Sequence, residues 1–276
     1  MRGMNTGPIP IVDRDALRRQ QIRAARAPVT FLTEEVATEV HEKLKDVNRT
    51  FSRVAIIGRE SSVLASSLPQ ATVFSDDDVI DFAGEKFDLV IHDLSLHWAN
   101  DPVGQLVQCR LALQPDGLFI GTLFGGQSLH ELRSVLAEAE IETLGGLSPR
   151  VAPMGEIRDL GALLQRAGFA LPVADSMTLS VTYEDQFRLM KDLRAMGEAN
   201  ALFARMKTFT PRRLLELAAV KYQNNFAAGE NRINATFEIV MLTGWAPDES
   251  QPKPLRPGSA TNRLANALGT TETKLD

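Results

Sequence analysis

The sequence predicts an α/β protein built on a doubly wound parallel sheet, and three observations carry this prediction. Short apolar strands alternate with helical segments from residue 53 to residue 167. The run Phe87–His92 is apolar almost throughout, which is typical of a central parallel strand covered on both faces. The apolar segment Val54–Ile57 is followed by Gly58 and a helical pattern, as in the strand–turn–helix unit of such sheets.

The first fifty residues are expected to form an N-terminal helical arm, residues 1–50. A basic helix is expected from about Arg14 to Ala25 with Asp13 as its N-cap, and an amphipathic stretch follows over Leu32 to Leu44. The basic helix is expected either to pack on the domain or to dock on an acidic partner.

The core is expected over residues 51–183. Its predicted strands are Arg53–Ile57, Ala71–Phe74, Phe87–His92, Leu118–Phe124 and Val173–Thr182. Its predicted helices are Ser61–Ser67, Pro102–Leu113, Ser128–Glu142 and Met154–Ala167. The segment Gln114–Gly117 reads as a turn, and Gly168 follows its helix as a C′ glycine does.

The last part of the chain departs from the alternation. Helices are expected at about Glu184–Ala199 and Pro211–Ala227, within a unit of residues 184–230, before a strand over Ala235–Trp245. Two late strands that bracket helices predict an antiparallel sheet edge with a helical cap inserted between the last two strands. Residues 231–276 then hold this last core strand and a Pro-rich tail, expected to wrap the surface.

The short span from Gly58 to Phe87 predicts a reduced sheet. Fewer than 30 residues separate the two positions, whereas a complete half of a doubly wound sheet places two crossovers there, each of at least ~10–12 residues. We therefore expect one edge strand and its helix to be missing.

Composition excludes several classes of function. A net charge of −5 argues against a nucleic-acid partner held by bulk charge. The single cysteine, Cys109, allows no disulfide within the chain, which fits a reducing compartment and predicts a cytoplasmic protein. No apolar run approaches the ~20 residues of a membrane helix. The four histidines and single cysteine form no metal-binding pattern, so no metal site is predicted.

The loop after the first strand is a candidate cofactor site. A dinucleotide or S-adenosylmethionine fold places a Gly-rich loop there, so that backbone N–H groups approach the cofactor. Gly58 stands at the first glycine position, but Glu60 and Ser62 stand where the next two would be. Asp76, about 20 residues on, is a candidate ribose ligand or else one of three solvated acids.

Further candidates follow the central strand and lie in the cap. His92 and Asp93 are expected to face the crevice as cofactor contacts, with Asp93 also assisting catalysis. His97 is expected to act as a general base or substrate contact, or else to pack beside Trp98 with satisfied nitrogens. The residues expected to face a substrate from the cap side are Trp98, Arg194, Glu198 and Asn200. A solvated Arg194–Glu198 pair is the alternative for two of them.

Several segments together resemble one known family. They are Asp13-Arg14, Leu94–Trp98 with Asn100-Asp101, Gln114–Gly117, Phe124–Gly126, Ser148–Arg150, Asp192–Arg194 with Met196–Glu198, Leu242–Trp245, Glu249–Gln251 and Arg256–Ala260. With these the chain resembles the methyltransferase-like assembly factors of respiratory complex I (assembly factor 5 in the mitochondrial nomenclature). That family is related to the malonyl-carrier-protein O-methyltransferase of biotin synthesis.

The resemblance implies a class I S-adenosylmethionine-dependent methyltransferase fold and a protein substrate. It also implies a link to arginine hydroxylation on a complex I subunit during assembly. Three hypotheses stay open: an enzyme that uses S-adenosylmethionine on a protein side chain, a non-catalytic assembly or binding protein, and a small-molecule or carrier-protein O-methyltransferase. The residues leave the oligomeric state undetermined.

Overall fold

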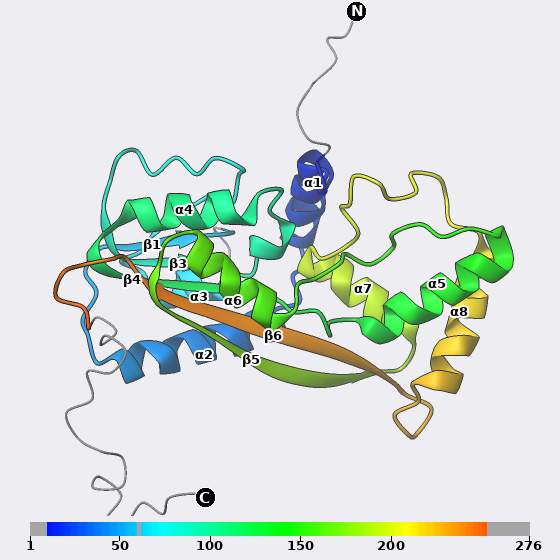
Figure 1. The fold of residues 1–276 in the computed structure, drawn as a ribbon. Coiled ribbons are helices and arrows are strands. Elements are labelled where there is room, and N and C mark those ends of the chain that lie inside the picture. The colour runs from blue at the N-terminus through cyan, green and yellow to red at the C-terminus, as the bar shows by residue number, and fades with distance from the viewer. Residues whose placement is uncertain (1–9, 60–61, 253–276) are drawn as a thin grey trace, which may run out of the picture.

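The computed structural model describes residues 10–59 and 62–252 (Figure 1). Its helices are α1 (Arg14–Ala24), α2 (Phe31–Val47), α3 (Val63–Ser67), α4 (Pro102–Ala112), α5 (His130–Leu144), α6 (Ile157–Arg166), α7 (Gln186–Met196) and α8 (Arg212–Asn225). Its strands are β1 (Val54–Ile57), β2 (Thr72–Phe74), β3 (Phe87–His92), β4 (Leu113–Phe124), β5 (Ala170–Tyr183) and β6 (Ile233–Trp245). Glu60, the predicted helix start at Ser61 and the tail segment Arg256–Ala260 lie outside the described residues.

The described strands form one sheet in the order β2-β1-β3-β4-β6-β5. Strands β2, β1, β3 and β4 are parallel to one another, whereas β6 is antiparallel to both β4 and β5. This confirms the predicted fold class, with an antiparallel edge and the helices α7 and α8 inserted between the last two strands. The edge strand is β2, and residues 75–86 contain neither helix nor strand, as the short span before Phe87 predicted.

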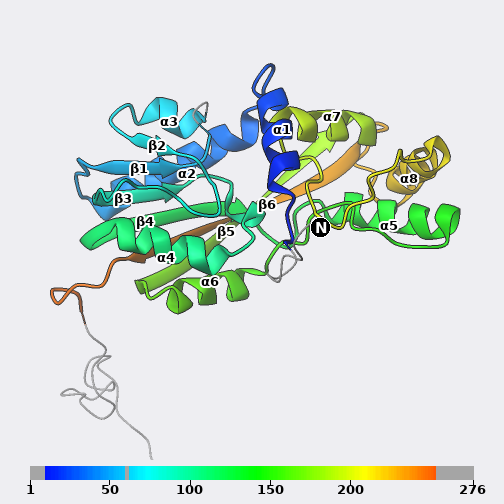
Figure 2. The same cartoon turned by 90° about the horizontal axis from the view of Figure 1, so that it is seen from above.

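Helices cover both faces of the sheet, as a doubly wound core requires (Figure 2). On one face, α4 and α6 bury Leu106, Cys109 and Leu164 against the strands. On the other, α2 buries Leu32 and Val36. The Cys109 thiol is fully buried, and burial raises its pKa far above the ordinary range, which fits a structural rather than a nucleophilic thiol.

The two longest strands extend beyond the core and carry the cap (Figure 1). At their far end, Glu131 of α5 is buried and accepts hydrogen bonds from Asn234 Nδ2 at 3.2 Å and Thr236 Oγ1 at 2.5 Å on β6. Tyr222 of α8 donates its hydroxyl to the Asn234 carbonyl at 2.9 Å. These buried polar bonds fix α5 and α8 on the extended strand, because an unpaired buried carboxylate or hydroxyl is costly.

Local signals in the sequence are mostly confirmed. The Asp13 carboxylate caps α1 by accepting from Ala16 N at 3.0 Å, and Gly168 follows α6 with a φ of +81°. The predicted turn Gln114–Gly117 falls inside β4, which begins at Leu113. The pairing with β3 is irregular there, because it passes from Leu113 opposite Phe87 to Leu118 opposite Leu89, and Asp116 has a φ of +57°. A short 3-10 helix, η1 (Leu96–Trp98), was not predicted.

Gly244 shows how tightly the core is packed. It lies opposite Phe119 in the β4–β6 pair, and a Cβ there would lie 2.9 Å from Cβ of Phe169 and 3.1 Å from its Cγ. We expect Gly244→Ala to lower the free energy of unfolding by ~1–3 kcal/mol through overpacking, measured by urea denaturation. At Gly146 an added Cβ meets nothing within 4 Å, so Gly146→Ala serves as control. Equal effects of the two replacements would contradict this account.

Candidate functional site

The first strand and the central strand meet at their carboxyl ends. Asp93 N donates to the Ile57 carbonyl at 2.8 Å, and a Cβ added to Gly58 would lie 3.3 Å from both Cβ and the carbonyl oxygen of Asp93. Gly58 therefore permits the close approach of two strand ends, in addition to any role toward a cofactor. The surviving glycine of the loop has a structural reason of its own.

Asp93 is a buried carboxyl group at this junction. Burial raises its pKa from 3.8 to about 6, while a hydrogen bond from Ser62 and the charge of Arg59 act in the opposite direction. Ser62 also caps α3 by accepting from Ala65 N at 3.0 Å. Asp93 lines a small cavity of about 60 Å³, so the structure places it at the crevice as expected.

His92 is a core residue, which corrects the expectation that its side chain faces the crevice. It is fully buried. Its Nε2 lies 3.1 Å from Gln105 Oε1 and its Nδ1 lies 3.2 Å from Ser95 Oγ. Burial lowers the pKa of the imidazole to about 4, so the ring is neutral at physiological pH and both nitrogens are occupied.

Glu198 is the centre of the site. Its Oε1 accepts from Arg59 Nη2 at 2.8 Å, and its Oε2 lies 3.0 Å from His97 Nε2 and accepts from Trp98 Nε1 at 2.7 Å. Burial alone raises the pKa of this carboxyl, but the charge and hydrogen bond of His97, the Arg59 charge and the Trp98 bond together lower it. Glu198 is thus a buried, ionised carboxylate, and it pairs with Arg59 and His97 rather than with Arg194.

His97 supports this carboxylate. Its side chain is 2 % exposed and packs edge-on against Phe124, with ring centroids 4.9 Å apart, and beside Trp98 at 5.3 Å. Its Nδ1 is buried and has no hydrogen-bond partner within residues 10–59 and 62–252. The ring packs beside Trp98, as the alternative to a general base predicted, but only one of its two nitrogens has a hydrogen-bond partner.

Asp76 lies at the end of β2 beside the N-terminal helix. Arg14 Nη2 is 3.3 Å from Asp76 Oδ1 and also donates to the Asp76 carbonyl, while Arg18 pairs with Asp77 at 2.6 Å. The Asp76 side chain is 13 % exposed, and its Oδ2 is buried without a partner in the described chain. It lines a groove of about 430 Å³ together with Gly58, Val73 and Phe74. Asp76 is therefore not a solvated loop acid, and α1 packs on its own domain.

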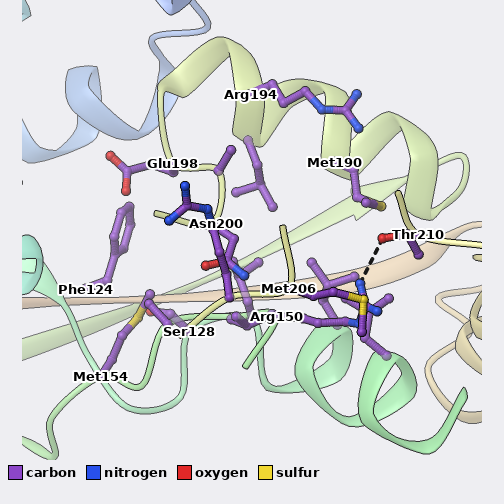
Figure 3. Close-up of a pocket in the computed structure, with 18 of the residues that line it drawn as sticks. Phe124, Ser128, Arg150, Met154, Met190, Arg194, Glu198, Asn200, Met206 and Thr210 are labelled. Carbon is purple, nitrogen blue, oxygen red and sulfur yellow. Dashed lines mark hydrogen bonds between the residues drawn. The ribbon is translucent and has the colours of Figure 1, made fainter. Parts of the chain in front are cut away.

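A pocket of about 470 Å³ lies between the sheet and the cap (Figure 3). Its wall is mainly apolar, and the residues with the largest apolar side chains are Trp98, Phe124, Leu129, Leu132, Leu136, Met154, Met190, Leu193, Met206, Phe209, Leu215 and Phe237. Three arginines also line it. Arg150 pairs with Glu140 at 2.8 Å and Arg205 with Asp13 at 2.9 Å, whereas Arg194 lies exposed at the rim.

The four residues predicted for the cap side all line this pocket. Asn200 also fixes the local chain, because its Nδ2 donates to the Pro149 carbonyl at 2.7 Å and its Oδ1 accepts from Leu202 N at 3.0 Å. Arg59 was not among the site residues predicted from the sequence. Its guanidinium reaches Glu198 and the carbonyl of Met196, a pairing across 139 residues of sequence that no local pattern signals.

Residues 10–59 and 62–252 contain neither an evident metal site nor an evident membrane-spanning helix. No group of three or more His, Cys, Asp or Glu side chains there is placed to hold a metal ion. In the same ranges, none of the helices combines the length and the apolar character that crossing a membrane requires.

Known proteins give the family. The chain is 36 % identical over 281 residues to the human mitochondrial arginine-hydroxylase NDUFAF5, covering 91 % of this chain and 81 % of the relative. The zebrafish protein of the same name is 34 % identical, over 96 % and 90 %. A malonyl-[acyl-carrier protein] O-methyltransferase of Halorhodospira halophila is 28 % identical, over 88 % and 91 %. No family model matches. The chain belongs to the NDUFAF5 arginine-hydroxylase family, as the sequence motifs indicated.

Among solved structures, the chain is similar to a methyltransferase-type protein from Bacillus halodurans. The two share 14 % identity with a TM-score of 0.48, over 75 % of this chain and 98 % of that one. The assignment of the fold rests on the strand order described above.

Replacing Asp93 tests the buried carboxyl group. Its pKa is about 6 in the folded protein against an ordinary value of 3.8, so ionisation between these pH values destabilises the fold. As pH rises from 4 to 7, we expect the unmodified protein to lose ~3 kcal/mol of unfolding free energy relative to Asp93→Asn, because the amide of the variant does not ionise. Urea denaturation over this range measures the difference, with Asp46→Asn, at an exposed position on α2, as control. A difference that does not change with pH would contradict the assignment.

Proposed function

We propose that this member of the arginine-hydroxylase family is an S-adenosylmethionine-dependent, methyltransferase-like protein that modifies a protein side chain during assembly of a complex I-type enzyme. One observation carries the proposal. Phe124 and Glu198 line both the small cavity beside Asp93 and the pocket under the cap. A cofactor-side cavity and a substrate-side pocket thus share one wall, and group transfer requires its two reactants to be adjacent.

The groove beside Asp76 fits the adenosine end of S-adenosylmethionine. Its volume of about 430 Å³ falls within the ~300–1,000 Å³ of small-molecule sites. The buried, unpartnered Oδ2 of Asp76 is suited to accept a ribose hydroxyl, and Gly58 leaves the groove open for a backbone approach. Arg59 lines both this groove and the cavity that contains Asp93, so we place the amino-acid part of the cofactor on that side. When bound, the cofactor supplies an electrophilic methyl group.

The cap pocket is suited to a protein side chain. Its apolar wall excludes water, and Glu198 presents an ionised carboxylate at one end, held by His97 and Trp98. His97 is therefore proposed as a residue that positions Glu198. Arg194 at the exposed rim and Asn200 at the chain turn are proposed to contact the substrate backbone, and Trp98 to pack on the entering side chain.

A non-catalytic assembly protein is the second candidate, and a specific observation favours it. Arg14 already occupies one oxygen of Asp76, and Arg59 crosses the space between the loop and the cap, so that only about 60 Å³ stays open beside Asp93. A carrier-protein O-methyltransferase, the activity that the name of the Halorhodospira relative states, fits less well. The ionised Glu198 in the pocket wall repels a carboxylate substrate.

We propose a respiratory complex I-type subunit as the partner and no nucleic acid, in line with the net charge of −5. The two NDUFAF5 relatives named above carry the word mitochondrial in their names. A cytoplasmic location for this chain stays a prediction, based on its single, buried cysteine.

Calorimetric titration with S-adenosylmethionine tests the cofactor. We expect binding to the unmodified protein and a ~10–100-fold weaker affinity in Asp76→Ala, because a hydrogen bond to a charged acceptor is worth ~1.5–3 kcal/mol. Asp46→Ala removes an exposed acid on α2 that does not line the groove and should bind normally. A folded protein that releases no heat at millimolar cofactor would leave the non-catalytic assembly protein as the better account.

Mass spectrometry tests the substrate. In a host that makes the chain naturally, proteins captured with it should include a subunit whose arginine carries an added methyl group or an added oxygen. We expect Glu198→Gln to abolish this modification. The control Glu216→Gln changes an exposed ion pair with Arg212 on α8 and should leave it intact. Captured subunits without modified arginine, in both the unmodified protein and the control, would contradict a modifying activity.

A further inference from the structure

Arg59 and Glu198 form a guanidinium-binding arrangement between the loop and the cap. Arg59 Nη2 donates to Glu198 Oε1 at 2.8 Å, and Nη1 of the same guanidinium donates to the Met196 carbonyl. Two acceptors are thus spaced to match the two terminal nitrogens of one planar cation. This fork geometry suits guanidinium and is poorly matched by the point charge of an ammonium group.

The partners of Glu198 differ in how exchangeable they are. His97 and Trp98, which hold Oε2, come from one short 3-10 helix and are almost wholly buried. Arg59, which holds Oε1, is 31 % exposed in its side chain and comes from the loop after β1. A competing cation can therefore replace Arg59 without dismantling the part of the site that fixes the carboxylate.

The approach to Glu198 from the cap pocket selects a long side chain. The pocket is lined by apolar groups such as Phe124, Met154 and Leu193 and has Glu198 in its wall (Figure 3). A side chain with an aliphatic stem and a cationic head buries the stem along such a wall and presents the charge to the carboxylate. Arg150 and Arg205 are neutralised by acids, and Arg194 points away from Glu198 in Figure 3.

We propose that Glu198 Oε1 and the Met196 carbonyl form the site that binds a substrate guanidinium, and that Arg59 occupies this site in the free protein. Arg59 is then an internal competitor, which an incoming arginine side chain displaces. This inference rests on the proposed function, because it assigns the recognition of an arginine-bearing protein to the boundary between the cap pocket and the cavity beside Asp93. Glu198 lines both spaces, whereas Met196 and Arg59 line the cavity beside Asp93. Displacement also opens the contact that separates the pocket from the cavity beside Asp93.

Binding of N-acetyl-L-arginine amide tests the proposal without cofactor or partner protein. The readout is the ¹H–¹⁵N signal of the Trp98 indole, whose N–H donates to Glu198. Trp245, the other of the two tryptophans, serves as an internal reference. We expect weak binding to the unmodified protein and ~10-fold tighter binding to Arg59→Ala, because the Arg59 guanidinium no longer competes for Glu198 Oε1 and the Met196 carbonyl. The control Arg53→Ala, which removes an exposed arginine paired with Glu85, should match the unmodified protein.

Two further arms keep the test decisive. N-acetyl-L-citrulline amide, neutral and of similar shape, should not bind Arg59→Ala, and Glu198→Gln should lose arginine amide binding. Arg59→Ala leaves a buried carboxylate oxygen without its cation, so arginine amide should also raise its melting temperature more than that of the unmodified protein. Equal affinities of the unmodified protein and Arg59→Ala, or equal binding of citrulline and arginine amides, would overturn the proposal. Since neither probe involves S-adenosylmethionine, a failed cofactor titration leaves this result unaffected.

Discussion

The buried carboxylate of Glu198 is the constraint on which the arrangement of loop, sheet and cap depends. It joins Arg59 after β1, His97 and Trp98 after β3, and the residues that follow α7, which are 100 to 139 positions apart in sequence. A buried carboxylate that loses its cation costs several kcal/mol, so Glu198 stabilises the contact between these segments as long as a cation occupies its Oε1. The cap position over the strand ends is therefore fixed by chemistry at the site itself.

A second buried carboxylate, that of Glu238, positions the chain that follows β4. Glu238 on β6 accepts from Gln127 N at 2.8 Å, and its Oε2 lies so close to Gly125 that a Cβ there would be 2.5 Å away. Gly125 leaves room for this carboxylate, and a larger residue at that position would force the Glu238 side chain to move. Phe124, immediately before Gly125, is thereby placed where it packs on His97 and lines both cavities. Gly125 therefore helps to place Phe124, which lines both cavities.

The sequence was a reliable guide where local chemistry decides the outcome. The Asp13 cap, the apolar strand at Phe87–His92 and the antiparallel last strand follow from short-range patterns, and the short span before Phe87 revealed the reduced sheet edge. It was less reliable where distant segments decide. The path of Arg59 depends on Glu198 139 residues away, and His92 is turned into the core by Gln105 of α4. The turn signal at Gln114–Gly117 corresponds to an irregularity inside β4, because pairing with β3 already begins with Leu113 opposite Phe87.

The N-terminal helix α1 compensates for the reduced sheet edge. With no strand beyond β2 among the described residues, the acids after β2 lack the neighbouring unit that a complete half-sheet supplies. Arg14 and Arg18 of α1 provide their counter-charges instead, and Arg14 Nη1 also donates to the Trp98 carbonyl at 3.3 Å. The helix thus links the groove at Asp76 to the segment that holds Glu198. A ligand in the groove therefore contacts α1, and α1 in turn contacts the segment that holds Glu198. In this way the cofactor side and the substrate side of the proposed reaction are connected without a complete half-sheet.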